Sequence, residues 1–182
     1  MQNHSHNKNK YSKYLNMEKK MENKVVIGIG DYAVVKDNTP ITTVGLGSCI
    51  GIVLYDETAN VSGMSHIMLP KMGSKQDKIG KYADTAIPAL LDEMKKAGAK
   101  IEKIKAKLAG GASLFDFAND NLQIGQRNAE AVKVKLKEYH IVVLRNDLGG
   151  NRGRTITFFP DDKRLHIKMV KKGPDDPTEK II

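Results

Sequence analysis

Residues 41–56 read ITTVGLGSCIGIVLYD and join two apolar segments through a glycine-rich turn. The segment at 50–56 is apolar almost throughout, which predicts a buried strand. Another strand is predicted at 61–69, where Pro70 ends it. Because only a short turn near residues 58–60 separates these two strands, we expect them to form a hairpin.

The rest of the chain predicts further strands and two helices. Six side chains between residues 82 and 97 recur at helical spacing and predict one apolar face: Tyr82, Ala86, Ile87, Leu90, Leu91 and Met94. A second helix is expected at 125–138. Further strands are expected at 25–29, 32–36, 101–109, 140–147, 155–159 and 164–170. Strands that arrive in runs predict an α+β fold, a mixed α/β sandwich whose central sheet is flanked by helices.

The composition divides the chain into three parts. Residues 1–23 are polar and basic, which predicts a disordered extension. Residues 24–172 are expected to form one domain, and residues 173–182 a flexible tail. No run of 18 apolar residues occurs and the N-terminus lacks the apolar core of a secretory signal, so we expect a cytoplasmic protein without membrane insertion.

The net charge of +9 favours acidic partners, although solubility alone explains it equally well. Only 5% of residues are aromatic, there is no Trp, and no basic block follows a known reading motif, so we do not expect nucleic-acid binding. A GxGxxA pattern at 28–33 resembles a dinucleotide fingerprint. A strand rather than a helix is predicted after it, which argues against a phosphate site.

Cys49 is the only cysteine, so the chain has no internal disulfide. The small residues before it would let the backbone amides near Gly47 and Ser48 approach a reacting carbonyl as an oxyanion hole. The same residues also suit a plain tight turn leading into a core strand. A thiol becomes a strong nucleophile only when a nearby base removes its proton.

Three histidines lie in the predicted domain, and one of them suits the role of that base. The predicted hairpin brings His66 to the same end of the sheet as Cys49, across 17 residues of sequence. His140 begins a strand and His166 lies in a C-terminal hairpin, where surface or structural roles are simpler. A Cys49–His66 pair is therefore a hypothesis from spacing alone.

Several separate motifs, in order and over about residues 25–170, resemble the chemoreceptor glutamine deamidase family (CheD). The segments that carry this resemblance are GLGSC at 45–49, GxxHxMLP at 63–70, KYADTA at 81–86, AKLAGGASLF at 106–115, IGQRNAEAV at 124–132 and GGNRGRT at 149–155. The resemblance implies a fold similar to the catalytic domains of deamidating toxins. It also implies conversion of receptor glutamine side chains to glutamate through a thioester, with release of ammonia.

The resemblance further implies a Cys–His–Thr triad without metal or organic cofactor. Cys49 matches the nucleophile, His66 the base and Thr43 the third member, although a one-residue shift would select Thr42 instead. In the GGNRGR loop, the three residues with polar side chains are candidates for substrate contact, and a merely solvated loop is equally consistent with them: Asn151, Arg152 and Arg154.

The partners implied are the cytoplasmic part of methyl-accepting chemotaxis receptors and a CheC-type phosphatase. One alternative is a regulator that binds this phosphatase and whose amidase activity is secondary. Another is a protease or a transglutaminase-like enzyme, because the chemistry leading to the thioester is shared.

Overall fold

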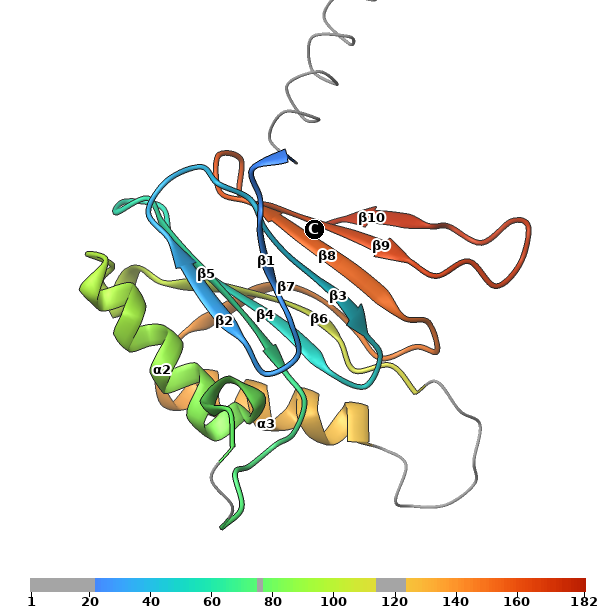
Figure 1. Ribbon diagram of the computed structural model, residues 1–182, viewed down its shortest axis with the longest axis horizontal. Helices are drawn as coiled ribbons and strands as arrows, with labels where there is room; N and C mark the ends of the chain where they lie inside the picture. Colours follow the sequence, from blue (N-terminus) through green and yellow to red (C-terminus); the bar gives the residue numbers. More distant parts are fainter. Residues whose placement is uncertain (1–21, 75–76, 114–123) are drawn as a thin grey trace, which may run out of the picture.

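The computed structural model describes residues 22–74, 77–113 and 124–182, which form two facing five-stranded sheets and two long helices (Figure 1). The helix-side sheet has the order β2-β5-β4-β6-β7, with β2 Tyr32–Val35, β5 Val61–Ile67, β4 Ile50–Asp56, β6 Lys105–Gly110 and β7 Val142–Leu148. The outer sheet has the order β1-β3-β8-β9-β10, with β1 Val25–Ile27, β3 Ile41–Leu46, β8 Arg154–Phe159, β9 Arg164–Met169 and β10 Glu179–Ile181.

Strand β4 lies at the centre of the helix-side sheet and is buried along its whole length. Its side chains alternate between two cores, as the pleat requires. Ile50, Ile52 and Leu54 pack in the core under the helices, whereas Val53 and Tyr55 pack in the core between the two sheets. This alternation confirms the predicted buried strand, and the pairing of β4 with β5 confirms the predicted hairpin.

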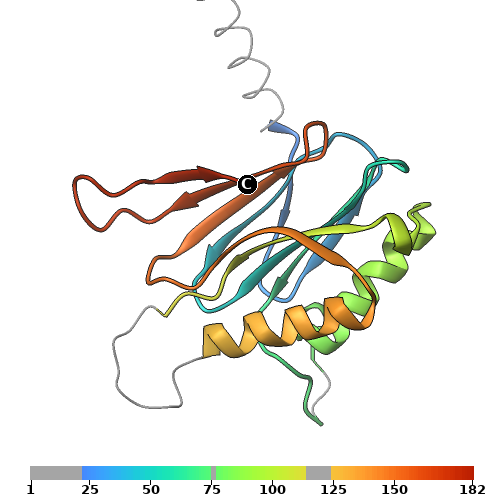
Figure 2. The same cartoon turned by 180° about the vertical axis from the view of Figure 1, so that it is seen from behind.

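Helices α2 (Ala83–Lys96) and α3 (Ile124–Glu138) cover the face of the helix-side sheet that points away from the outer sheet (Figures 1 and 2). The buried face of α2 consists of Ala83, Ala86, Ile87, Leu90, Leu91 and Met94. That of α3 consists of Gly125, Asn128, Ala129, Val132 and Leu136. Helix α2 therefore buries nearly the face that the sequence predicts, and α3 lies where the second helix is expected.

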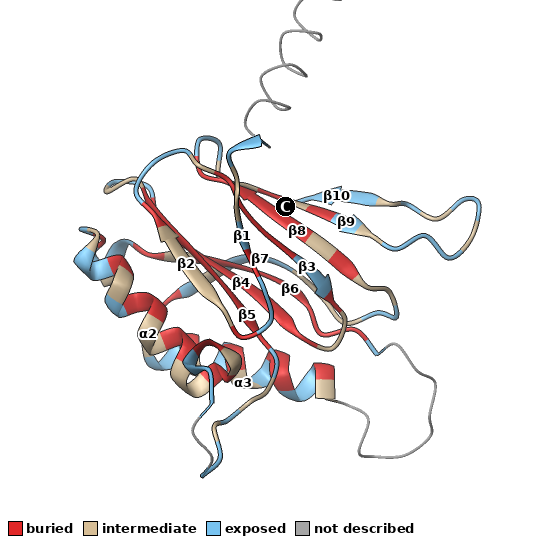
Figure 3. Cartoon of the chain, in the orientation of Figure 1, coloured by how far each residue is buried: buried red, intermediate tan, exposed pale blue. Residues whose placement is uncertain are grey.

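The α+β class is confirmed, with one difference in arrangement. The central sheet carries helices on one face only, and the outer sheet occupies the other, so Figure 3 shows buried residues both under the helices and between the two sheets. Short 3₁₀ turns occur at η1 (Ile79–Lys81) and η2 (Ile101–Lys103), so the strand predicted from residue 101 begins only at Lys105.

The C-terminal end differs from the flexible tail expected at 173–182, because it adds strand β10 to the edge of the outer sheet. Lys180 pairs with Ile167, and Ile182 exchanges two backbone hydrogen bonds with Leu165. The extension expected at 1–23 lies almost entirely outside the described residues. Among the residues that are described, no helix is long and apolar enough to cross a membrane.

Candidate active site

The register between β4 and β5 places Cys49 and His66 on the same face of the sheet. Gly51 lies directly opposite His66, and Cys49 lies two residues before Gly51. Cys49 immediately precedes β4, and side chains two residues apart in an extended segment share a face, so the thiol and the imidazole lie on one face at diagonal positions. Cys49 packs in the core between the sheets, so this shared face is the one that looks toward the outer sheet.

Thr43 reaches His66 from the opposing sheet. Its Oγ1 lies 2.8 Å from His66 Nδ1 and 2.9 Å from the carbonyl oxygen of Ile27. A carbonyl oxygen only accepts, so the single hydroxyl proton is donated to Ile27 and His66 Nδ1–H donates to Thr43. The imidazole proton is therefore on Nδ1, and Nε2 carries the free lone pair that a general base requires.

The alternation of β3 separates the two candidate threonines. The Thr42 side chain contacts the neighbouring strand β8 of the outer sheet, where its Oγ1 lies 2.8 Å from the Ile156 carbonyl and 2.9 Å from Thr157 Oγ1. Thr43 points across to His66 instead. In this geometry Thr43 is the one of the two that orients the imidazole.

Burial keeps the thiol and the imidazole uncharged. His66 is fully buried, and desolvation lowers its pKa to about 4 against a smaller opposing effect of Asp31. Desolvation likewise raises the pKa of the Cys49 thiol, with its own backbone N–H acting in the opposite sense. Within the described residues, His66 Nε2 has no hydrogen-bond partner. The resting pair is therefore a neutral thiol and a neutral imidazole.

The turn before β4 is anchored by its carbonyl oxygens. The oxygens of Gly47 and Cys49 accept from the backbone amides of Ala112 at 2.7 Å and Gly111 at 2.8 Å. The Gly47 amide donates to Gly45 at 3.0 Å. In the described part of the chain, neither the Ser48 nor the Cys49 amide donates to an oxygen, so these two N–H groups are the free donors of the turn.

Asn128 holds the same turn from helix α3 and was missed as a functional candidate by the sequence reasoning. Its Nδ2 donates to the carbonyl oxygens of Ser48 at 2.9 Å and Met68 at 2.8 Å. The side chain is fully buried. An asparagine on an otherwise apolar helix face is the signal that could have identified it, because a buried amide requires hydrogen-bond partners.

The segment 28–31, which resembles a nucleotide fingerprint, packs against His66 instead. The Gly30 amide donates to the His66 carbonyl at 2.9 Å, and the His66 amide donates to the Asp31 carbonyl at 3.1 Å. Strand β2 follows it, as predicted, and no helix opens there. The segment therefore fixes the backbone of His66.

The GGNRGR loop lies next to this end of the sheet, but its two arginines are engaged within the protein. Arg154 is buried, pairs with Asp147 at 2.7 Å and donates to the Gly149 carbonyl at 2.7 Å. Arg152 donates to the Pro177 carbonyl at 2.8 Å, whereas Asn151 is exposed. The loop touches the site through Gly149, whose amide donates to the Gly110 carbonyl beside the turn.

The groups gathered here are a thiol, an imidazole with a free Nε2, a hydroxyl that fixes the tautomer, and two free backbone amides. These are the groups that acyl transfer to a cysteine requires. Among the described residues, no cluster of three or more His, Cys, Asp or Glu side chains could hold a metal ion. The α+β fold thus gathers, at one end of its central sheet, the types of group that thiol-dependent acyl transfer uses.

Comparison with known proteins then identifies the family. The model of the family described as "CheD chemotactic sensory transduction" matches residues 68–169. A chemoreceptor glutamine deamidase CheD of Halalkalibacterium halodurans is 51% identical over 158 residues, covering 84% of this chain and 98% of the relative. One of Thermotoga maritima is 49% identical over 150 residues, covering 82% and 94%. The chain belongs to the CheD family.

A solved structure also shows a distant likeness. The hypothetical protein YfiH of Bacillus licheniformis superposes with a TM-score of 0.42 at 11% identity, covering 64% of this chain and 50% of that one.

Proposed function

We propose that this protein is a cysteine-dependent deamidase that hydrolyses glutamine side chains of chemotaxis receptors to glutamate and ammonia. The relatives carry the name chemoreceptor glutamine deamidase, and the chain covers nearly their whole length. The single observation that supports the chemistry best is the Thr43–His66 hydrogen bond. It leaves Nε2 unprotonated on the face that His66 shares with the Cys49 thiol.

In the first half-reaction, His66 Nε2 removes the thiol proton as Cys49 Sγ attacks the carboxamide carbon of the bound glutamine. The proton moves during the attack, because burial disfavours a resting ion pair. The oxyanion that forms accepts hydrogen bonds from the free amides of Ser48 and Cys49. His66 Nε2–H then protonates the departing nitrogen, the C–N bond breaks, and ammonia leaves a thioester on Cys49.

In the second half-reaction, neutral His66 removes a proton from a water molecule that attacks the thioester carbonyl. The same amides hold the second oxyanion, the C–S bond breaks, and His66 returns the proton to the sulfur. The products are glutamate and free enzyme. Thr43 keeps the imidazole in the required tautomer throughout, and no cofactor takes part in either step.

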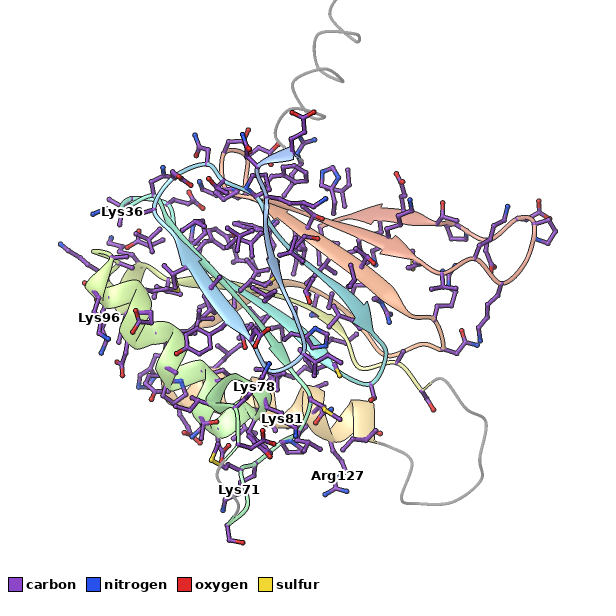
Figure 4. All side chains as sticks on the ribbon, in the orientation of Figure 1. Lys36, Lys71, Lys78, Lys81, Lys96 and Arg127 are labelled. Atoms are coloured by element: carbon purple, nitrogen blue, oxygen red, sulfur yellow. The ribbon has the colours of Figure 1, made fainter. Side chains whose placement is uncertain are left out.

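Cationic side chains at this end of the molecule favour an acidic protein substrate. Lys71 and Arg127 are exposed, and neither has an ion-pair partner in the described part of the chain. The segments that carry them meet at Met68. Lys71 follows Met68 by three residues, and Arg127 directly precedes Asn128, whose side chain donates to the Met68 carbonyl. Figure 4 shows both side chains at the opposite end of the molecule from Lys36.

A matched pair of charge reversals tests this surface. Lys71→Glu should lower kcat/KM for a receptor fragment, with the loss shrinking as salt rises. Lys36→Glu alters the charge at the far end and should leave kcat/KM unchanged. Equal effects of both changes would mean that the attraction is not localised at the site.

The experiment that tests the proposed chemistry is intact-mass analysis of a receptor cytoplasmic fragment, together with ammonia release. Wild-type protein should convert glutamine side chains to glutamate without cutting the chain, which separates a deamidase from a protease. Cys49→Ala should abolish ammonia release. Turnover retained by Cys49→Ala would refute the nucleophile assignment.

The contacts of Arg152 and Arg154 favour a role in supporting the loop, which leaves Asn151 as the loop side chain free to meet substrate. A CheC-type phosphatase stays a predicted partner. A cytoplasmic location also stays a prediction. If the chain were primarily a regulator of this phosphatase, Cys49→Ala would still bind and stimulate it. That outcome, together with absent deamidation by the wild type, would replace the proposal.

A further inference from the structure

Asn128 joins two segments that carry the proposed chemistry. Its side-chain nitrogen donates one proton to the Ser48 carbonyl at 2.9 Å and the other to the Met68 carbonyl at 2.8 Å. Ser48 directly precedes the thiol, and Met68 follows His66 by two residues. Both protons of the amide are therefore used to bridge the turn before β4 and the end of β5.

The first of these bonds fixes the direction of a backbone donor. The Ser48 carbonyl and the Cys49 N–H belong to one peptide unit, which is planar and trans, so they point in opposite directions. Holding the carbonyl toward α3 aims the Cys49 N–H away from α3. The Ala112 amide does the same for the Ser48 N–H, because it holds the carbonyl of Gly47.

The side-chain oxygen of Asn128 argues against a role in stability alone. Asn128 is fully buried, and its Oδ1 has no hydrogen-bond partner within the described residues. An unpaired buried oxygen costs free energy, which an apolar side chain in the same place would not. What such a side chain would lack is the pair of donors that bridges the two carbonyls.

We infer that Asn128 is a positioning residue that aims the Cys49 N–H at the oxyanion. This inference rests on the proposed function, since it assigns a role within that reaction. Asn128 touches neither the substrate nor the reacting atoms. Its effect is transmitted through the two carbonyl oxygens.

Two reactions of Cys49 separate this role from a general structural one. Deamidation passes through an oxyanion, so a misaimed N–H slows it, whereas alkylation by iodoacetamide displaces iodide and forms no oxyanion. In Asn128→Asp and Asn128→Ala, which lack the two donors, kcat should fall about 100-fold with KM little changed. The alkylation rate should stay within about 3-fold of wild type, a margin well below the expected loss in kcat.

Leu136→Ala is the matched control, because it truncates a buried side chain on the same face of α3 two turns further on. It should destabilise the fold and leave kcat unchanged. The Ala variant of Asn128 only removes atoms, so it keeps the test open if the Asp variant does not fold.

Three outcomes would overturn the inference: wild-type kcat in both Asn128 variants, equal losses in deamidation and alkylation, or an equal loss of kcat in Leu136→Ala. An active wild type with an inactive Cys49→Ala would leave the proposed function standing in each case.

Discussion

Replacing Thr43 by valine should separate the orientation of the imidazole from the stability of the fold. Valine has nearly the same shape as threonine but has no hydroxyl, so His66 Nδ1–H and the Ile27 carbonyl both lose their partner. Each buried polar group left unpaired costs about 1–3 kcal/mol. The free energy of unfolding should therefore fall by a few kcal/mol at most while the fold persists.

The effect on turnover follows from the tautomer. Without Thr43 the imidazole proton is no longer held on Nδ1, so part of the population carries it on Nε2 and cannot accept the thiol proton. Enforcing the wrong tautomer in a serine protease lowers kcat roughly 10⁴-fold. Because Thr43→Val releases the tautomer without enforcing the wrong one, we expect a smaller loss in kcat, on the order of 10–100-fold.

Thr42→Val provides the control within the same strand. Thr42 is also buried and also makes two hydrogen bonds, but to Ile156 and Thr157. It should lose comparable stability in urea denaturation and keep its kcat for deamidation of a receptor fragment. A folded Thr43→Val with wild-type kcat, or an equal loss in Thr42→Val, would refute the reasoning from the tautomer.

Three further predictions concern pH and the support of the site. The unfolded chain takes a proton on His66 below about pH 6.5 and the folded chain only near pH 4, so the free energy of unfolding should fall by up to about 3 kcal/mol as the pH is lowered from 6.5 to 4. Urea midpoints should show this loss in wild type and less of it in His66→Gln. Parallel plots of midpoint against pH for the two proteins would contradict it. Because burial raises the pKa of the Cys49 thiol, alkylation by iodoacetamide should still increase with pH near the usual value of 9, whereas a plateau near pH 7 would reveal a thiolate at rest. Gly110→Ala should abolish deamidation and destabilise the fold by several kcal/mol, because Gly110 has a φ of +115° and an added Cβ would overlap the Cys49 carbonyl oxygen. Gly149→Ala is the control. Gly149 has a φ of +80° but open space around it, so this change should cost only the backbone strain of about 1–3 kcal/mol.

Much of the fold was predictable because the local patterns are strong. The apolar run at 50–56 fixed β4 as a buried strand, and the short connection to 61–67 fixed the hairpin and the shared end of Cys49 and His66. The spacing of apolar residues fixed both helices to within two residues at either end. Local sequence carries this information because strand and helix periods are set by the backbone itself.

The sequence by itself determined the α+β class, the family and the placement of Cys49 and His66 at the same end of one hairpin. Only the tertiary structure decided which threonine orients His66, because Thr43 reaches it from a different sheet. It also decided that Asn128 anchors the turn before Cys49 and that Arg154 forms an ion pair with Asp147. The physical reason is common to these cases: each contact joins segments whose proximity depends on how the layers pack, which no local pattern records.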